Sequence, residues 1–164
     1  MIDWPVPSDA LAKWEQFYSA SKLWPHVIPV AFPRFVDIYA EANVSKSYGG
    51  LDDDNGVSFR RMLQRAEASN AKIVQLATWN DWGEGTVVEP CREFGYRDLE
   101  IVQEIRQPQF GQGISSTPED LRLPIRLLQR RRRATSDTQQ KLLDRIAGII
   151  SAGDLPAARA ELQR

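Results

Sequence analysis

Hydrophobic side chains recur along the first part of the chain at helical and then at strand-like spacing. The first helical pattern follows Ser8, a typical capping residue, and extends to about Lys22. Its apolar positions are Leu11, Trp14, Phe17 and Tyr18. A nearly continuous apolar run then spans residues 27–32 between two prolines, which predicts a strand buried on both faces. Pro29 inside this run argues against a regular strand, because it removes one backbone donor.

The same order is repeated after a polar interval. Residues 34–56 show no clear period and hold turn-forming glycines and aspartates, which predicts a long loop of the kind that carries function. A second amphipathic helix follows, with an apolar face of Phe59, Met62, Leu63 and Ala66 and a solvent face of Arg60, Arg61, Arg65 and Glu67. Residues 72–78 are again mostly apolar and predict the next strand. Helix, strand, loop, helix, strand is typical of a β/α fold with a parallel sheet.

Helices are predicted for the remainder. One extends from about Tyr96 to Arg106, and a cluster of proline and glycine residues ends its pattern. We therefore expect a β/α domain over residues 1–113 and an all-α tail over residues 114–164. In the tail, Thr117 and Pro118 predict a helix start, and Pro124 is expected to kink that helix.

Charge separates the two parts. From Pro118 onward ten basic residues face six acidic ones, so this part carries +4 and the first 117 residues carry −5. The run Arg130–Arg133 suggests a nucleic-acid or membrane surface. The alternative is a solvated helix end, where cations are favoured. The tail holds no aromatic side chain that could stack on bases, so we predict no nucleic-acid partner. A helix-mediated protein contact is a further hypothesis, based on the apolar stripe Leu142, Leu143, Ile146, Ile149 and Ile150.

Several function classes lose their usual support from composition and motifs. A single cysteine, Cys91, excludes an intramolecular disulfide, and with one histidine, His26, a Cys/His metal site has too few ligands. Nucleotide and zinc-hydrolase motifs are absent, so we expect neither a metal nor a cofactor. The acidic segment 52–56 fits a turn better than a calcium loop, because Leu51 would occupy the first ligand position.

Membrane and export signals are not found either. No apolar run approaches the roughly 18 residues of a membrane span. Residues 1–5 lack the basic start of a signal peptide, so a cytoplasmic location is expected unless the true N-terminus lies elsewhere.

The densest functional signal is residues 78–90, directly after the second predicted strand. In α/β sheets and barrels, ligands bind beyond the carboxyl ends of the strands. Asp81 and Glu84 supply the two carboxylates that glycosidic bond cleavage needs, one as acid and one as nucleophile or base. Trp79 and Trp82 flank them with flat faces that suit sugar rings. We take Asp81 and Glu84 as the candidate catalytic pair.

A purely structural interpretation of this segment remains open. In that interpretation Asp81 caps the next turn, the two tryptophans fill the end of a core, and Glu84 is solvated. The further candidates for substrate contact have the same alternative, since each could simply lie on a loop surface. The candidate substrate-binding residues are Trp79, Asn80, Trp82, Asp37 and Tyr48, with Tyr39 beside them.

The segment resembles the motif Asn-Glu-Trp-His-Glu-Gly-Thr-x-Ile-Glu-Pro of glycoside hydrolase family 99, the endo-α-mannosidases and endo-α-mannanases. It is still more similar to the WbsX-type proteins found with bacterial surface-polysaccharide genes. Weaker matches at residues 30–37 and 93–96 extend the resemblance over roughly residues 27–103. The resemblance implies a (β/α)8 barrel whose last two strands are present here. It also implies that Glu84 is the general acid/base, while Asp81 assists attack by the sugar's own 2-hydroxyl through an anhydro-sugar intermediate.

The chain departs from the family at three positions. Asp81 replaces a glutamate, Gly83 a histidine and Arg34 a glycine. The resemblance therefore supports a carbohydrate-processing site in this chain more strongly than it supports the mannosidase mechanism. We expect a glycoside hydrolase-like protein acting on mannose-containing or bacterial surface polysaccharide. The alternative is a non-catalytic carbohydrate-binding or scaffold protein with a basic helical tail.

Length adds one expectation. A (β/α)8 barrel needs at least roughly 200 residues, whereas barrel-like patterns cover only the first 117 here. We therefore expect the C-terminal portion of a larger barrel, inactive alone. If the chain is complete, we expect an open partial sheet whose exposed strand edges promote self-association.

Overall fold

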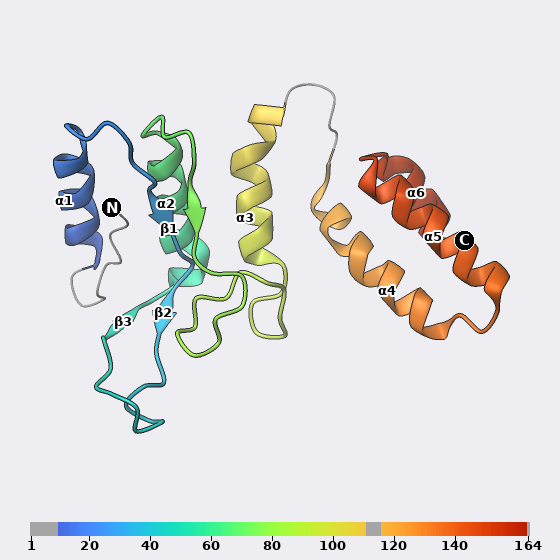
Figure 1. The fold of residues 1–164 in the computed structure, drawn as a ribbon, viewed down its shortest axis with the longest axis horizontal. Helices are drawn as coiled ribbons and strands as arrows, with labels where there is room; N and C mark the ends of the chain where they lie inside the picture. Colours follow the sequence, from blue (N-terminus) through green and yellow to red (C-terminus); the bar gives the residue numbers. More distant parts are fainter. Residues whose placement is uncertain (1–9, 111–115, 164) are drawn as a thin grey trace. The chain divides into compact units, whose positions relative to one another are not determined.

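The computed structural model describes residues 10–110 and 116–163 (Figure 1). The chain divides into two compact units, Met1–Ile105 and Arg106–Arg164. The expected domain boundary between residues 113 and 114 lies outside the described residues, as does the expected cap, Ser8. Each unit has its own hydrophobic core, and no residue belongs to both cores.

A short parallel strand pair lies at the centre of the first unit. β1 (Val30–Ala31) pairs with β4 (Gln75–Leu76), with Val30 opposite Gln75 and Ala31 opposite Leu76. The predicted parallel pairing is confirmed, but the strands are two residues long instead of the six and seven expected. Prolines at 29 and 33 bracket β1, and a proline offers no backbone N–H for a ladder. A parallel pair needs a crossover connection, and the α2 helix provides it.

Three helices pack around this strand pair: α1 (Ala10–Ser21), α2 (Val57–Glu67) and α3 (Arg97–Arg106). In Figure 1 the pair lies between α1 and α3, with α2 behind it. All four predicted apolar positions of α2 are buried, and so are Trp14, Phe17 and Tyr18 of α1. The three predicted helices are thus confirmed, with ends shifted by one or two residues, and the buried faces are confirmed for α2 and for these positions of α1.

The polar face of α2 is less solvated than expected. Only Arg61 of the four predicted solvent-facing residues is exposed. The Arg65 guanidinium lies 3.9 Å above the centre of the Tyr18 ring, and Arg60 forms two hydrogen bonds to Glu104 of α3. The aliphatic part of an arginine or lysine side chain can cover apolar surface, and its charged group can lie over an aromatic ring. The spacing of residues along the chain does not reveal such contacts.

Part of the predicted loop over residues 34–56 is ordered as a second sheet. β2 (Phe35–Val36) pairs antiparallel with β3 (Gly50–Leu51), and η2 (Asp54–Gly56) leads into α2. The turn interpretation of the acidic segment holds, because Asp52 and Asp53 each accept a hydrogen bond from the backbone N–H two residues further on. The expectation of an irregular loop was wrong for β2 and β3, whose two-residue strands are too short to give a period.

The second unit is helical as predicted. It contains η3 (Gln107–Phe110), η4 (Pro118–Arg122), α4 (Leu123–Arg133), α5 (Asp137–Ser151) and α6 (Leu155–Gln163). A capping box of Thr117 and Asp120 begins η4. The kink expected at Pro124 is wrong, because this proline lies in the first turn of α4, where its missing N–H has no helical partner to lose. The buried core residues are Leu123, Leu127, Leu143, Ile146, Ala158 and Leu162.

The arginine run at the end of α4 is partly used within this unit. Arg131 lies 2.5 Å from a carboxylate oxygen of Asp144, and Arg130 donates to the backbone carbonyl of Glu161 over 3.5 Å. Arg132 and Arg133 are exposed in the last turn, where cations are favoured by the helix dipole. Among the helices in the described ranges, none combines the length and apolar character needed to cross a membrane.

Candidate functional site

Two segments meet at the carboxyl end of the β1–β4 pair. One is the loop of residues 78–89 after β4, and the other is the stretch that begins with β2. The backbone N–H of Val36 donates to the carbonyl of Glu84 over 2.9 Å, and that of Ile38 donates to Gly83 over 3.0 Å. Figure 1 shows both segments at the end toward which the strand arrows point. The site therefore lies where ligand sites of α/β sheets are found.

The 78–89 loop is held in shape by its own polar groups. The Thr78 hydroxyl accepts the Asp81 backbone N–H over 3.0 Å and lies 3.0 Å from the Thr86 hydroxyl. Thr86 is fully buried. Gly85 has φ +66°, and a Cβ there would lie 3.2 Å from the Val36 carbonyl oxygen. This close approach is why the loop needs a glycine at position 85.

The two candidate carboxylates lie on this loop and both accept hydrogen bonds. Tyr39 donates its hydroxyl to Oε1 of Glu84 over 2.7 Å, and Oδ1 of Asp81 accepts the backbone N–H of Glu84 over 3.1 Å. The bond to Glu84 is the main cause that raises the pKa of Tyr39 to about 12. Asp81 therefore has the capping role of the structural interpretation, while it remains exposed to solvent.

The tryptophans do not fill a core. Trp79 is 54% exposed and Trp82 is 56% exposed, so this part of the structural interpretation is wrong. The Trp82 indole N–H donates to Oε1 of Glu89 over 3.1 Å, which fixes one edge of the ring. Asn80 is exposed, and its carbonyl accepts the Trp82 backbone N–H over 3.1 Å. Carboxylates and open aromatic faces thus share one short loop.

Asp37 and Tyr48, the other candidates for substrate contact, belong to the facing loop. Asp37 accepts hydrogen bonds from the backbone N–H groups of Tyr39 and Tyr48 and from the Ser47 hydroxyl, over 3.1, 2.7 and 3.0 Å. Tyr48 is exposed, and its ring meets that of Tyr39 edge-on at 5.6 Å between centres. The structure thus places Asp37 as the organiser of a loop that presents Tyr39 to Glu84. The sequence did not single out Tyr39 as a partner of Glu84, because two residues that are 45 positions apart share no local pattern.

A buried ionic cluster anchors the base of the site. It includes Arg34, one of the three positions at which the chain departs from the family. Arg34 forms an ion pair with Asp98 and donates to the Val87 carbonyl over 2.7 Å. Its guanidinium also lies 3.6 Å from the centre of the Phe94 ring. Arg97 bridges Asp98 to Asp53 over 3.1 and 2.6 Å. Two arginines and two aspartates balance in charge here, as a buried group of this kind requires.

The protonation of this cluster follows from the same contacts. Burial acts to raise the pKa of Asp53, but hydrogen bonds from Arg97 and the Asn55 backbone outweigh it and hold that pKa below its ordinary value. Elsewhere in the described ranges, no group of three or more His, Cys, Asp and Glu side chains is arranged to hold a metal ion.

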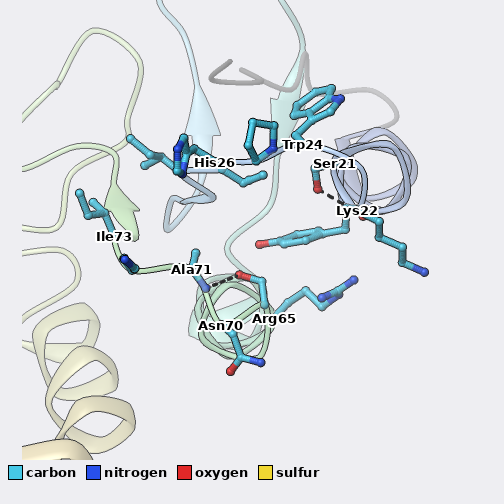
Figure 2. Close-up of a pocket in the computed structure, with 14 residues that line it drawn as sticks. Ser21, Lys22, Trp24, His26, Arg65, Asn70, Ala71 and Ile73 are labelled. Carbon is cyan, nitrogen blue, oxygen red and sulfur yellow. Dashed lines mark hydrogen bonds between the residues drawn. The ribbon is translucent and has the colours of Figure 1, made fainter.

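A pocket of about 760 Å³ lies at the other end of the strands. It is lined by residues that precede β1 and β4 and by side chains of α1 and α2. In Figure 2, Trp24 and His26 lie on one side of it and Arg65 and Asn70 on the other, while the Lys22 side chain extends away from His26. None of the candidate site residues lines it.

Comparison with known proteins supports the carbohydrate-active class. The mixed α/β chain matches, over residues 52–102, the model of a family described as "Glycosyltransferase WbsX". Over these residues the chain is similar to WbsX-type proteins, which confirms that part of the resemblance drawn from the sequence.

Two solved structures are also similar, both of a GH99 endo-α-mannosidase from Bacteroides thetaiotaomicron. The first, in complex with Bis-Tris propane, has a TM-score of 0.46 and 20% identity, and the match covers 66% of this chain and 40% of that one. The second has a TM-score of 0.43 and 23% identity, with 63% and 37% covered. The chain thus spans about two fifths of their length. No curated protein is significantly similar in sequence.

Proposed function

We propose that residues 78–89 and the loop facing them form a carbohydrate-processing site of glycoside hydrolase type. Its substrate is a mannose-containing or bacterial surface polysaccharide. One observation carries the proposal: Asp81 and Glu84 lie on one ordered loop beyond the end of β4, and the same loop holds two tryptophans that are each more than half exposed. Carboxylates supply the proton transfer and charge stabilisation that glycoside cleavage needs, and indole faces suit sugar rings.

The residues take distinct parts in this proposal. Glu84 and Asp81 are the catalytic pair, and Trp79 and Trp82 hold the sugar. Asn80, Asp37 and Tyr48 lie around them on the same two loops and complete the substrate-facing surface. The two strands of the parallel pair are the last two of a (β/α)8 barrel, whose other units supply the remaining walls. This is consistent with the span of two fifths of the similar mannosidases.

Turnover measurements with matched variants test the catalytic part. The full-length gene product is assayed on α-mannosides and on bacterial surface glycans, alongside Glu84→Gln and Glu93→Gln. Glu93 is an exposed glutamate outside the loop, so its variant controls for the loss of one negative charge. We expect Glu84→Gln to lose at least about a hundredfold in kcat, the usual contribution of a general acid or base. Equal activity in wild type and Glu84→Gln would contradict the assigned role.

A non-catalytic carbohydrate-binding function is the second candidate. It is favoured by the capping bond of Asp81, which gives that carboxylate a structural use. Titration with oligosaccharides while following tryptophan fluorescence distinguishes the two, with Trp79→Phe and Trp82→Phe to locate the signal. Saturable binding without turnover supports this candidate, and no response at millimolar sugar counts against both.

The second unit is proposed to contact a partner protein through a helix face. Ile125 and Leu128 of α4 are 40% and 41% exposed and lie three residues apart, on one side of the helix. Sedimentation of the wild type and of a variant with serine at both positions tests for association through this face. An unchanged sedimentation profile across a wide concentration range, with no partner bound by the wild type, would remove this proposal.

A further inference from the structure

We propose that Glu89 is a positioning residue that fixes the orientation of the Trp82 ring and occupies its indole N–H. Trp82 then meets a sugar through its ring surface and not as a hydrogen-bond donor. The part that Trp82 plays for a sugar rests on the proposed function, whereas its bond to Glu89 rests on geometry. The Trp82 indole N–H donates to Oε1 of Glu89 over 3.1 Å, so the contact joins the two side chains directly.

Glu89 extends from a fixed point of the loop. Its backbone N–H donates to the carbonyl of Trp79 over 2.9 Å, which ties the end of the 78–89 loop to its beginning. The backbone N–H of Val88 lies 3.1 Å from the carbonyls of both Thr78 and Trp79, and the Val88 side chain is buried. These contacts hold the backbone of Glu89. The bond between Oε1 and the indole N–H then holds the Trp82 ring relative to that backbone.

Trp82 depends on this bond because packing covers less than half of it. The side chain is 56% exposed, and the bond from its backbone N–H to Asn80 does not restrain the ring. An exposed side chain moves between rotamers, and ordering it when a ligand binds costs conformational entropy. A hydrogen bond at the far edge of the indole restricts both side-chain torsions before any ligand arrives. Glu89 thus lowers the entropy that Trp82 loses on binding.

The same bond decides how Trp82 contacts a ligand. An indole has a single N–H donor and no acceptor, and in Trp82 that donor is used by Glu89. What remains for a ligand is apolar ring surface, which suits the C–H groups of a sugar ring. Hydrogen bonds to sugar hydroxyls then come from the polar side chains of the loop, namely Asn80, Asp81 and Glu84. Trp82 therefore selects for the shape of the sugar ring.

The indole ¹H–¹⁵N signals of the whole chain test the bond without any ligand. The chain has five tryptophans, and the Trp82 signal is the one that Trp82→Phe removes. We expect Glu89→Ala to shift this signal and to speed the exchange of its proton with solvent about fivefold, the effect of one lost hydrogen bond. Glu89→Gln keeps an acceptor oxygen and should retain most of the protection.

The control for this measurement is Glu93→Ala, which removes an exposed carboxyl group outside the loop. It should leave the Trp82 signal unchanged. Backbone amide spectra establish that each variant is folded. A Trp82 signal with the same position and exchange rate in wild type and in folded Glu89→Ala overturns the inference.

A double-mutant cycle on sugar binding measures the consequence for the ligand. The probes are an α-linked mannose oligosaccharide and a bacterial surface polysaccharide, followed by calorimetry. We expect Glu89→Ala to weaken binding about fivefold in the wild type and to have no further effect in Trp82→Phe, which has no indole N–H to hold. Equal losses in both backgrounds overturn the inference. If neither probe binds while the indole signals behave as expected, the proposed function fails and the bond of Glu89 to Trp82 stands.

Discussion

Asp98 is the most buried acidic residue of the ionic cluster beneath the site, and only 3% of its side chain is exposed. Removing one member of a buried ion pair leaves the other charge uncompensated and costs about 3–5 kcal/mol. We expect Asp98→Asn to lower the free energy of unfolding by about 3 kcal/mol in urea denaturation. Glu104→Gln is the control, because it removes an exposed partner of Arg60 and should lower the stability much less than Asp98→Asn does. Equal effects of the two variants would contradict the anchoring role.

Gly85 shows the same dependence on local geometry in the backbone. Its φ of +66° disfavours any side chain, and a Cβ would crowd the Val36 carbonyl at 3.2 Å. Gly85→Ala should therefore cost about 1–2 kcal/mol and disturb the backbone bonds that join the two loops. Gly83→Ala is the matched comparison, since its Cβ would meet the nearest atom at 3.4 Å. Thermal melts and amide shifts of residues 36–38 measure both effects, and a harmless Gly85→Ala would refute the close-approach argument.

At the scale of helices, α5 begins at a capping box. Ser136 accepts the Gln139 backbone N–H over 3.3 Å, and the Gln139 side chain accepts the N–H groups of Ser136 and Thr135. Ser136→Ala should cost about 1 kcal/mol and speed hydrogen exchange in the first turn of α5. Exchange in the last turn of α5 is the internal control. Unchanged exchange at the start of α5 would show that packing alone sets the helix start.

Asp120 links η4 to α6 and makes the second unit sensitive to acid. Burial acts to raise its pKa, but bonds from Thr117 and Arg159 outweigh it and lower the pKa below the ordinary value. A lowered folded pKa gives stability that is present above the unfolded pKa of about 3.9 and is lost as pH falls through the folded value. We expect the denaturant concentration at the unfolding midpoint to decrease once the pH is below about 4. It should decrease less in Asp120→Asn, which lacks the titrating group. Identical pH profiles for the two proteins would contradict this link.

Elements long enough to repeat their hydrophobic pattern were predictable, and two-residue strands were not. The apolar face of α2 was visible in the sequence, since three turns repeat the same pattern, and the capping signal at Thr117 was visible as a local motif. β2 and β3 were missed, because two residues cannot show an alternation. The lengths of β1 and β4 were overestimated, since an apolar run reports burial and not ladder pairing.

Because the two units have separate cores, we expect a core mutation to destabilise only the unit that contains it. Phe59 and Leu123 are both fully buried, one in each core. Phe59→Ala should cost about 3–5 kcal/mol and Leu123→Ala about 2–5 kcal/mol. Each loss should appear as reduced hydrogen-exchange protection in the unit that holds the mutated residue, because the cores share no side chain. Equal loss of protection in both units from either variant would show that they fold as one.

Local sequence pattern was sufficient to predict the order of the α-helices and of β1 and β4, the parallel pairing of these two strands and the resemblance to WbsX-type proteins. It also determined the position of the loop that carries Asp81 and Glu84, because these depend on local pattern and motif. The exposure of Trp79 and Trp82, the anchoring bonds of Arg34 and the contact of Tyr39 with Glu84 became visible only in the folded chain. These contacts join residues far apart along the chain, and their formation depends on packing and backbone geometry that no local spacing encodes.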